Sequence, residues 1–78
     1  MTDVREGLGQ RIRTARRERG LTVAEVALAV NRAVSTVYVW EQGKAVPTVR
    51  DVLALSRALG RSVAWLLEGA RAAEARVA

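Results

Sequence analysis

The chain has 78 residues, half of them apolar, with a formal net charge of +5 and neither cysteine nor histidine. This length gives room for one small domain and little for the deep cleft of an enzyme. Without cysteine there is no disulfide framework or thiolate metal site, and without histidine the commonest general base is missing. No apolar run approaches the ~18 residues of a membrane span, and no apolar signal core follows the N-terminus. We therefore expect a cytoplasmic protein with no membrane contact, catalytic residues, metal, cofactor or small-molecule ligand.

The first predicted helix starts at Val4 or Leu8 and ends at Arg19, because Leu8, Ile12 and Ala15 share one face and Gly20 follows. Its opposite face is basic, and twelve of the thirteen basic residues in the chain are arginine, whose planar fork suits phosphate. Charge alone leaves two interpretations open. The arginines form either a solvated helix face or a surface that binds a polyanion such as nucleic acid.

The segment LTVAEV carries the start of a second helix. Thr22 at the N-cap and Glu25 three residues later form a capping box, and the apolar residues on either side form a hydrophobic staple. The helix is predicted over residues 23–30. It ends at Asn31, since asparagine tolerates the left-handed conformation better than most residues.

The next stretch, VSTVYVW, has the β-branched and aromatic composition of a strand. A strand needs a neighbour for its backbone hydrogen bonds, and no other part of the chain alternates at period two for more than a few residues. We therefore predict a helix from Ala33 to Gln42 that forms against its own propensity, because tertiary packing outweighs small local costs.

Two further helices are predicted after the loop GKAVP. Thr48 caps the first, with Asp51 three residues later, and Gly60 ends it. Ser62 caps a last short helix that runs to Leu67. We expect one domain over residues 1–69, followed by an Ala/Arg-rich tail over residues 70–78.

A short capped helix, a tight turn and a second helix form a helix-turn-helix. From Leu8 to Gly69 the chain resembles the lambda-repressor-like (Cro/cI-type, XRE) family in the stretches IRTARRERGLTVAEVA, STVYVWEQGKAVP and VRDVLALSRALGRSVAWLLEG. The resemblance implies an all-α, compact five-helix fold whose third helix recognises DNA, with transcriptional control, usually repression, as the function. Val23 and Val34 stand where the family commonly has polar residues, a departure that weakens hydrogen bonding to bases more than phosphate binding.

The family commonly links an arginine late in the first helix to a glutamate after the recognition helix, and the matching residues are Arg16 and Glu41. A two-bond guanidinium–carboxylate pair would set the angle of the recognition helix. The alternative is that both are surface charges worth under about 1 kcal/mol.

In the family's geometry the recognition helix enters the major groove between phosphate contacts. The residues expected to face bases are Val34, Ser35, Tyr38 and Val39, with the valines suited to thymine methyl groups. The expected phosphate contacts are Thr22, Gln42, Lys44, Arg13 and Arg17. Outward valines also suit a protein interface, so the alternative is a protein-interaction module, such as an antitoxin-type partner, on the same fold.

Family members usually bind two half-sites as symmetric dimers. The last helix has more apolar bulk than a short terminal helix can bury alone. The expected homodimer interface is therefore Trp65, Leu66 and Leu67.

Overall fold

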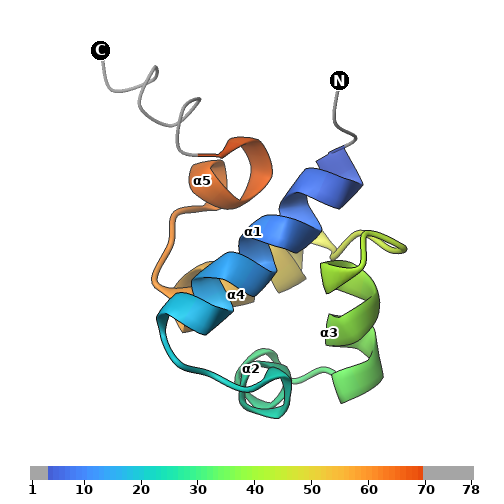
Figure 1. Ribbon diagram of the computed structural model, residues 1–78, viewed down its shortest axis with the longest axis vertical. Helices are drawn as coiled ribbons and strands as arrows, with labels where there is room; N and C mark the ends of the chain where they lie inside the picture. Colours follow the sequence, from blue (N-terminus) through green and yellow to red (C-terminus); the bar gives the residue numbers. More distant parts are fainter. Residues whose placement is uncertain (1–3, 70–78) are drawn as a thin grey trace.

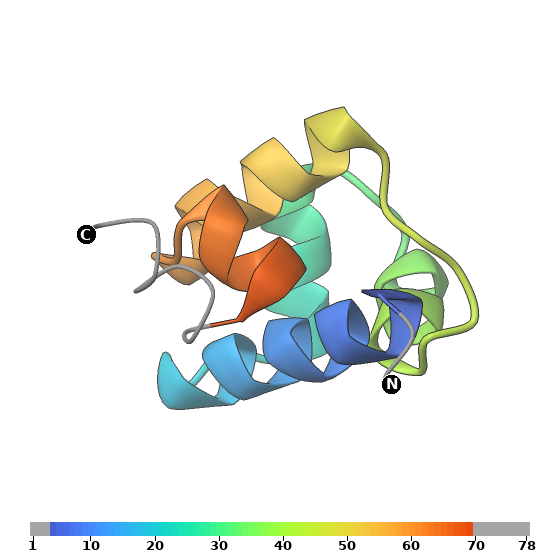
Figure 2. The same cartoon turned by 90° about the horizontal axis from the view of Figure 1, so that it is seen from above.

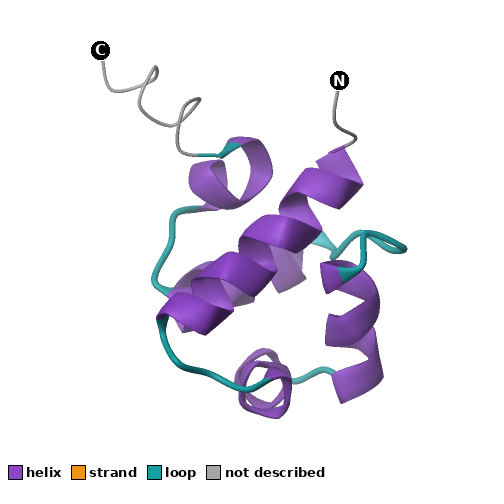
Figure 3. Cartoon of the chain, in the orientation of Figure 1, coloured by secondary structure: helices purple, strands orange, loops and turns teal. Residues whose placement is uncertain are grey.

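Five helices follow one another in the computed structural model, which describes residues 4–69 and the side chains from residue 7 onward. They are α1 (Val4–Glu18), α2 (Val23–Val30), α3 (Val34–Glu41), α4 (Val49–Leu59) and α5 (Val63–Glu68). No strand occurs within residues 4–69 (Figure 3). The all-α, five-helix prediction is confirmed. The predicted tail, residues 70–78, lies outside the described residues.

The helices surround one core, and α1 lies along one side of it, in contact with α3, α4 and α5. In Figure 1, α1 crosses in front of α4, with α3 on one side and α5 on the other. Figure 2, seen from above, shows α5 between α1 and α4. The core residues come from all five helices, namely Leu8, Ile12, Ala15, Val23, Val26, Ala27, Val30, Val37, Trp40, Val52, Leu55, Leu59 and Leu66.

Local signals set the helix starts as predicted. The Thr22 hydroxyl accepts from the Glu25 backbone N–H at 3.1 Å, while the Glu25 carboxylate accepts from the Thr22 N–H at 2.8 Å. Thr48 and Asp51 form the same reciprocal box at the start of α4. The Ser62 hydroxyl accepts from the Trp65 N–H and caps α5. Each box satisfies backbone donors that a helix leaves unpaired at its N-terminus.

The turn between α2 and α3 depends on Asn31, which adopts the left-handed conformation at φ 57° and ψ 48°. This reverses the chain so that α3 starts after Ala33, with no side-chain cap. Val37 and Trp40 are buried in the core, which explains why a strand-like sequence forms a helix here. The burial of these two side chains stabilises α3 by more than its propensity costs.

Gly9 permits a close approach between α1 and the end of α3. A Cβ atom at this position would overlap the Trp40 carbonyl oxygen and lie 2.9 Å from that of Glu41. Both are backbone atoms that side-chain rotation cannot move. A side chain at Gly9 would therefore push α3 away from α1.

We expect Gly9→Ala to lower the free energy of unfolding by about 1–3 kcal/mol, the usual cost of overpacking. Alanine favours a helix over glycine by up to about 1 kcal/mol, so propensity alone predicts the opposite sign. Gly7→Ala is the matched control, because its Cβ would meet only the tip of the Arg11 side chain, 2.9 Å away. Thermal unfolding of both variants checks this, and a Gly9→Ala protein as stable as Gly7→Ala would contradict it.

Candidate nucleic-acid interface

A partly buried ion pair between Arg16 and Glu41 joins α1 to the last residue of α3. Arg16 donates from Nε to Oε2 at 2.8 Å and from Nη2 to Oε1 at 3.1 Å, so the planar fork matches the carboxylate. Only 12% of the Arg16 side chain and 6% of the Glu41 side chain are exposed, so water screens the pair little. The hydrogen bond to Glu41 raises the pKa of Arg16, which therefore keeps its charge.

The remaining guanidinium nitrogen of Arg16 bonds to the loop before α2. This Nη1 donates to the Leu21 carbonyl oxygen at 3.0 Å. One side chain thus connects α1, the loop that enters α2 and the end of α3. The orientation of the helix-turn-helix relative to α1 depends on these contacts.

The outer face of α3 is exposed. Val34, Ser35 and Tyr38 all lie in contact with solvent, and Gln42 follows directly after the helix. Val39 differs, because it is only partly exposed and packs against the core. Val39 therefore lies at the edge of this face, with its side chain partly in the core and partly exposed, and its contact with bases stays a prediction.

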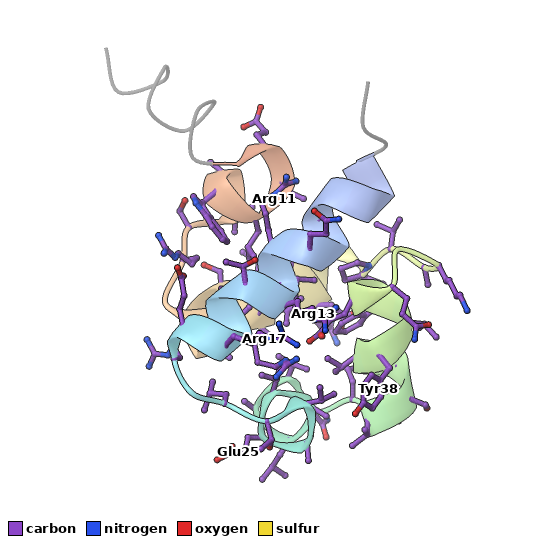
Figure 4. The ribbon with its side chains drawn as sticks, in the orientation of Figure 1. Arg11, Arg13, Arg17, Glu25 and Tyr38 are labelled. Carbon is purple, nitrogen blue, oxygen red and sulfur yellow. The ribbon has the colours of Figure 1, made fainter. Side chains whose placement is uncertain are left out.

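A hollow of about 510 Å³ lies where α1, the start of α2 and the end of α3 meet. We call it the basic hollow, and its lining residues are Arg13, Arg16, Arg17, Thr22, Val23, Tyr38, Glu41 and Gln42. In Figure 4, Arg13 and Arg17 extend from α1 on the side of α2 and α3, and Tyr38 lies on α3. The Glu41 carboxylate neutralises the charge of Arg16, whereas Arg13 and Arg17 are exposed. The hollow therefore presents two positive charges beside the exposed face of α3.

The start of α2 borders the same hollow through Thr22 and Val23. The Glu25 carboxylate balances the positive end of the helix dipole there, because it accepts from the Thr22 N–H. The two exposed arginines are therefore what makes the hollow favour an anion such as a phosphate group.

The fold and this geometry match a known family. The family model described as a helix-turn-helix domain covers residues 7–69. The chain belongs to this helix-turn-helix family. A comparison of the sequence with curated proteins finds no match.

Solved structures of regulators resemble this helix-turn-helix domain closely. The clp gene regulator ClgR from Corynebacterium glutamicum has a TM-score of 0.83 and 29% identity over 97% of this chain and 81% of its own. The P22 c2 repressor, in complex with a synthetic operator, has a TM-score of 0.77 and 32% identity over 80% of this chain and 94% of its own. The restriction-modification controller protein C.AhdI from Aeromonas hydrophila has a TM-score of 0.74 and 28% identity over 78% of this chain and 92% of its own. The fold is therefore the lambda-repressor-like fold of these regulators.

The structure brings four of the five predicted phosphate contacts to the basic hollow, namely Arg13, Arg17, Thr22 and Gln42. Lys44 lies apart from its lining, exposed in the loop after α3. The N–H and hydroxyl groups of Thr22 are already engaged with Glu25 in the capping box. Among the predicted phosphate contacts in the hollow, Arg13 and Arg17 are therefore the charged ones.

The predicted interface in the last helix needs correction. Leu66 is completely buried in the core and has no surface to offer a partner. Trp65 is partly buried, and the Arg61 guanidinium lies 4.5 Å from the centre of its ring. Only Leu67 is exposed. The prediction for Leu66 is wrong because α5 packs its central leucine between α1 and α4, which the helix sequence alone does not reveal.

Two positioning arginines were not predicted. Arg11 donates from Nε to the Leu66 carbonyl oxygen at 2.6 Å and from Nη2 to that of Leu67 at 2.8 Å, so it holds the last turn of α5. Arg32 lies 3.8 Å from the Asp51 carboxylate and 5.8 Å from the centre of the Trp40 ring. The only sequence signal for Arg11 is its place three residues after Leu8, beside the apolar face of α1.

Within residues 4–69, no helix is long and apolar enough to cross a membrane. The same part of the chain holds no group of three or more histidine, cysteine, aspartate or glutamate residues arranged for a metal ion.

We expect Glu41→Ala to lower the free energy of unfolding by about 2 kcal/mol, because it leaves the partly buried Arg16 guanidinium without its carboxylate partner. Glu18→Ala is the control, since Glu18 pairs with Arg61 at the same 2.8 Å but is half exposed. An exposed pair contributes under about 1 kcal/mol. Chemical denaturation of both variants tests the difference, and equal losses would show that the Arg16–Glu41 pair does not hold α3.

Acid should weaken the start of α2. Hydrogen bonds from the Thr22 backbone and side chain lower the pKa of Glu25 below its ordinary value of 4.5. This stabilisation is complete above the unfolded pKa and is lost as the pH falls through the lower, folded value. The Glu25→Gln variant keeps an acceptor oxygen that does not titrate. We therefore expect its stability to fall less than that of the wild type as the pH is lowered from 6 into the acid range. Melting curves at stepped pH check this, and parallel losses would contradict it.

Proposed function

We propose that the chain is a sequence-specific, double-stranded DNA-binding regulator of transcription, a repressor and not an enzyme. The observation that carries this proposal is the exposed face of α3 beside the basic hollow. The face offers side chains at the spacing of a recognition helix, and the hollow offers charge for the DNA backbone.

In this proposal the N-terminal half of α3 enters the major groove. The Ser35 hydroxyl donates or accepts a hydrogen bond at a base edge, and Val34 contacts a thymine methyl group. Tyr38, which borders both the face and the basic hollow, lies where base and backbone contacts meet. Val39, partly buried, contributes at the edge of this face.

The start of α3 offers a further contact. Because Ala33 provides no side-chain cap, the first N–H groups of the helix have no side-chain acceptor. A helix start of this kind can donate to a phosphate oxygen. The absence of a side-chain cap makes α3 less stable as an isolated helix, and in this proposal it leaves the N–H donors available to DNA.

Phosphate contacts on either side would hold α3 in the groove. Arg13 and Arg17 supply the charge from α1, Gln42 and Lys44 supply donors after α3, and Thr22 marks the start of α2. Their role is to position the helix and to make binding depend on salt.

The solved relatives support this function. The P22 c2 repressor was solved with a synthetic operator, ClgR is a clp gene regulator and C.AhdI is a controller protein. A DNA-binding regulator would act in the cytoplasm, with residues 1–69 as its binding domain. Because one such domain contacts only a few base pairs, we propose that it binds as a homodimer on two half-sites.

Binding to duplex DNA across a salt series tests the proposal. Each phosphate contact should add about 0.9 to the slope of log affinity against log salt, so Arg17→Ala should lower the slope by about one unit. Arg57→Ala, exposed on α4 outside the basic hollow, is the matched control and should leave the slope unchanged. A flat slope for the wild type would reject DNA binding and favour a protein partner.

Base reading predicts a different signature. Against a duplex selected from a random library, Val34→Ala should lose about 1 kcal/mol of preference over scrambled DNA with little change in salt slope. Lys44→Ala should weaken both duplexes equally. Full discrimination by Val34→Ala would remove Val34 from the base-reading face.

A further inference from the structure

Arg32 lies in the turn between α2 and α3, and its side chain extends to the start of α4. Its Nε lies 3.8 Å from Asp51 Oδ1, and its guanidinium carbon lies 5.8 Å from the centre of the Trp40 ring. Its backbone N–H donates to the Ala27 carbonyl oxygen at 2.9 Å, a bond that closes the end of α2 beside the left-handed Asn31. One residue therefore interacts with α2, α3 and α4.

The Asp51 carboxylate divides its two oxygens between two partners. Oδ2 accepts from the Thr48 N–H at 3.1 Å and from the Thr48 hydroxyl at 2.9 Å, as part of the box that caps α4. Oδ1 is the oxygen that pairs with Arg32. Only 7% of the Asp51 side chain is exposed, so its charge favours a cation close by. The capping box therefore holds the carboxylate in place as a fixed partner for Arg32.

The ion pair spans a space that apolar packing does not fill. A hollow of about 340 Å³ lies where the end of α2, the turn and the start of α4 meet, and we call it the turn hollow. Its apolar lining is Ala29, Val30 and Ala54, and its charged lining is Arg32, Arg50 and Asp51. Because alanine and valine side chains are short, the longer arginine side chain connects the turn to α4 on this side.

The two ends of α3 are held by different means. Its last residue is fixed by two hydrogen bonds from Arg16, whereas Ala33 at its start provides no side-chain cap. The first backbone bonds of the helix run from the Thr36 and Val37 N–H groups to the Ala33 carbonyl oxygen, at 3.0 and 3.3 Å. Arg32 directly precedes Ala33, so its side chain holds this first turn from the side of α4.

We infer that Arg32 is a specificity-determining residue that positions the start of α3 through Asp51. The inference rests on the proposed function, because Val34 and Ser35, the first residues of α3, are the ones we propose to contact bases. A shift of this turn moves both side chains relative to the base edges, whereas the phosphate contacts at the basic hollow stay in place. Arg32 itself contacts no base in this inference.

A direct contact with a DNA phosphate is the competing role for Arg32, because 46% of its side chain is exposed. Salt separates the two roles. Loss of a phosphate contact lowers the slope of log affinity against log salt by about 0.9 and weakens all duplexes equally. A displaced start of α3 instead weakens binding to the preferred duplex alone. The same exposure keeps the contribution of the pair to global stability small, so its loss should not unfold the domain.

Amide hydrogen exchange of the full chain without DNA, followed by NMR, tests the positioning role. Arg32→Met keeps an unbranched side chain and removes the charge. We expect the Thr36 and Val37 N–H groups to exchange about threefold faster in this variant, because the first turn of α3 opens more often. The Gln42 N–H, which bonds to the other end of α3, should keep its rate.

Three further variants identify the cause. Arg50→Met is the matched control, because it removes a charge from the same turn hollow, and it should leave the exchange rates unchanged. Arg32→Lys should keep the wild-type rates, since a single contact at 3.8 Å needs a cation but not the planar fork. In an Asp51→Asn background, which removes the acceptor charge, Arg32→Met should have no further effect.

Binding to DNA tests the consequence for specificity. Arg32→Met should lose about fivefold of the preference for a duplex selected from a random library over scrambled DNA, with little change in salt slope. Arg32→Lys and Arg50→Met should keep the preference. Full preference in Arg32→Met overturns the inference, and a slope lower by about one unit with it assigns Arg32 to a phosphate.

The exchange measurement also has outcomes that overturn the inference. These are unchanged rates at Thr36 and Val37 in Arg32→Met, an equal rise in Arg50→Met, or an undiminished effect of Arg32→Met in the Asp51→Asn background. Because this measurement contains no DNA, its failure is separate from a flat salt slope of the wild type, which would reject the proposed function.

Discussion

The Arg16–Glu41 pair is the interaction on which the DNA-facing part of this protein depends. A helix of eight residues with no N-cap and a strand-like composition is not stable alone, and its position must come from tertiary contacts. Trp40 and Val37 supply burial, which is not directional. The guanidinium fork supplies direction, because its two bonds to Glu41 allow one relative orientation. Its third contact, to Leu21, extends that control to the entry of α2.

Helix α1 is therefore more than a basic face. Gly9 lets α3 approach, Arg16 orients it, and Arg11 on another side of the same helix holds α5. The arginines divide by environment: those with internal partners position helices, whereas Arg13 and Arg17 are exposed at the basic hollow, where we propose that they contact DNA phosphates. Arg11 and Arg16 thus have a role as internal partners that neither interpretation of the charge included.

Two surfaces with different chemistry result from this arrangement. The face of α3 and the basic hollow combine charge with polar and apolar groups, whereas the pocket lined by residues of α4, α5 and the loop before α4 is apolar throughout. Salt should weaken DNA binding at the first surface, because it screens the attraction between arginine side chains and DNA phosphates. The two surfaces share no lining residue.

The sequence by itself determined both ends of α2 and the start of α4, because the capping boxes of Thr22 and Thr48 and the left-handed Asn31 act over three or four residues. It also indicated the family and the Arg16–Glu41 pair through matching positions. Only the tertiary structure decided which side chains are left for partners. Leu66 and Val39 could not be placed from helical spacing, since their burial depends on helices distant in the chain. The same holds for Gly9 and Arg11. Their contacts join α1 to the end of α3 and to α5, which are distant in the sequence and come close only in the folded chain.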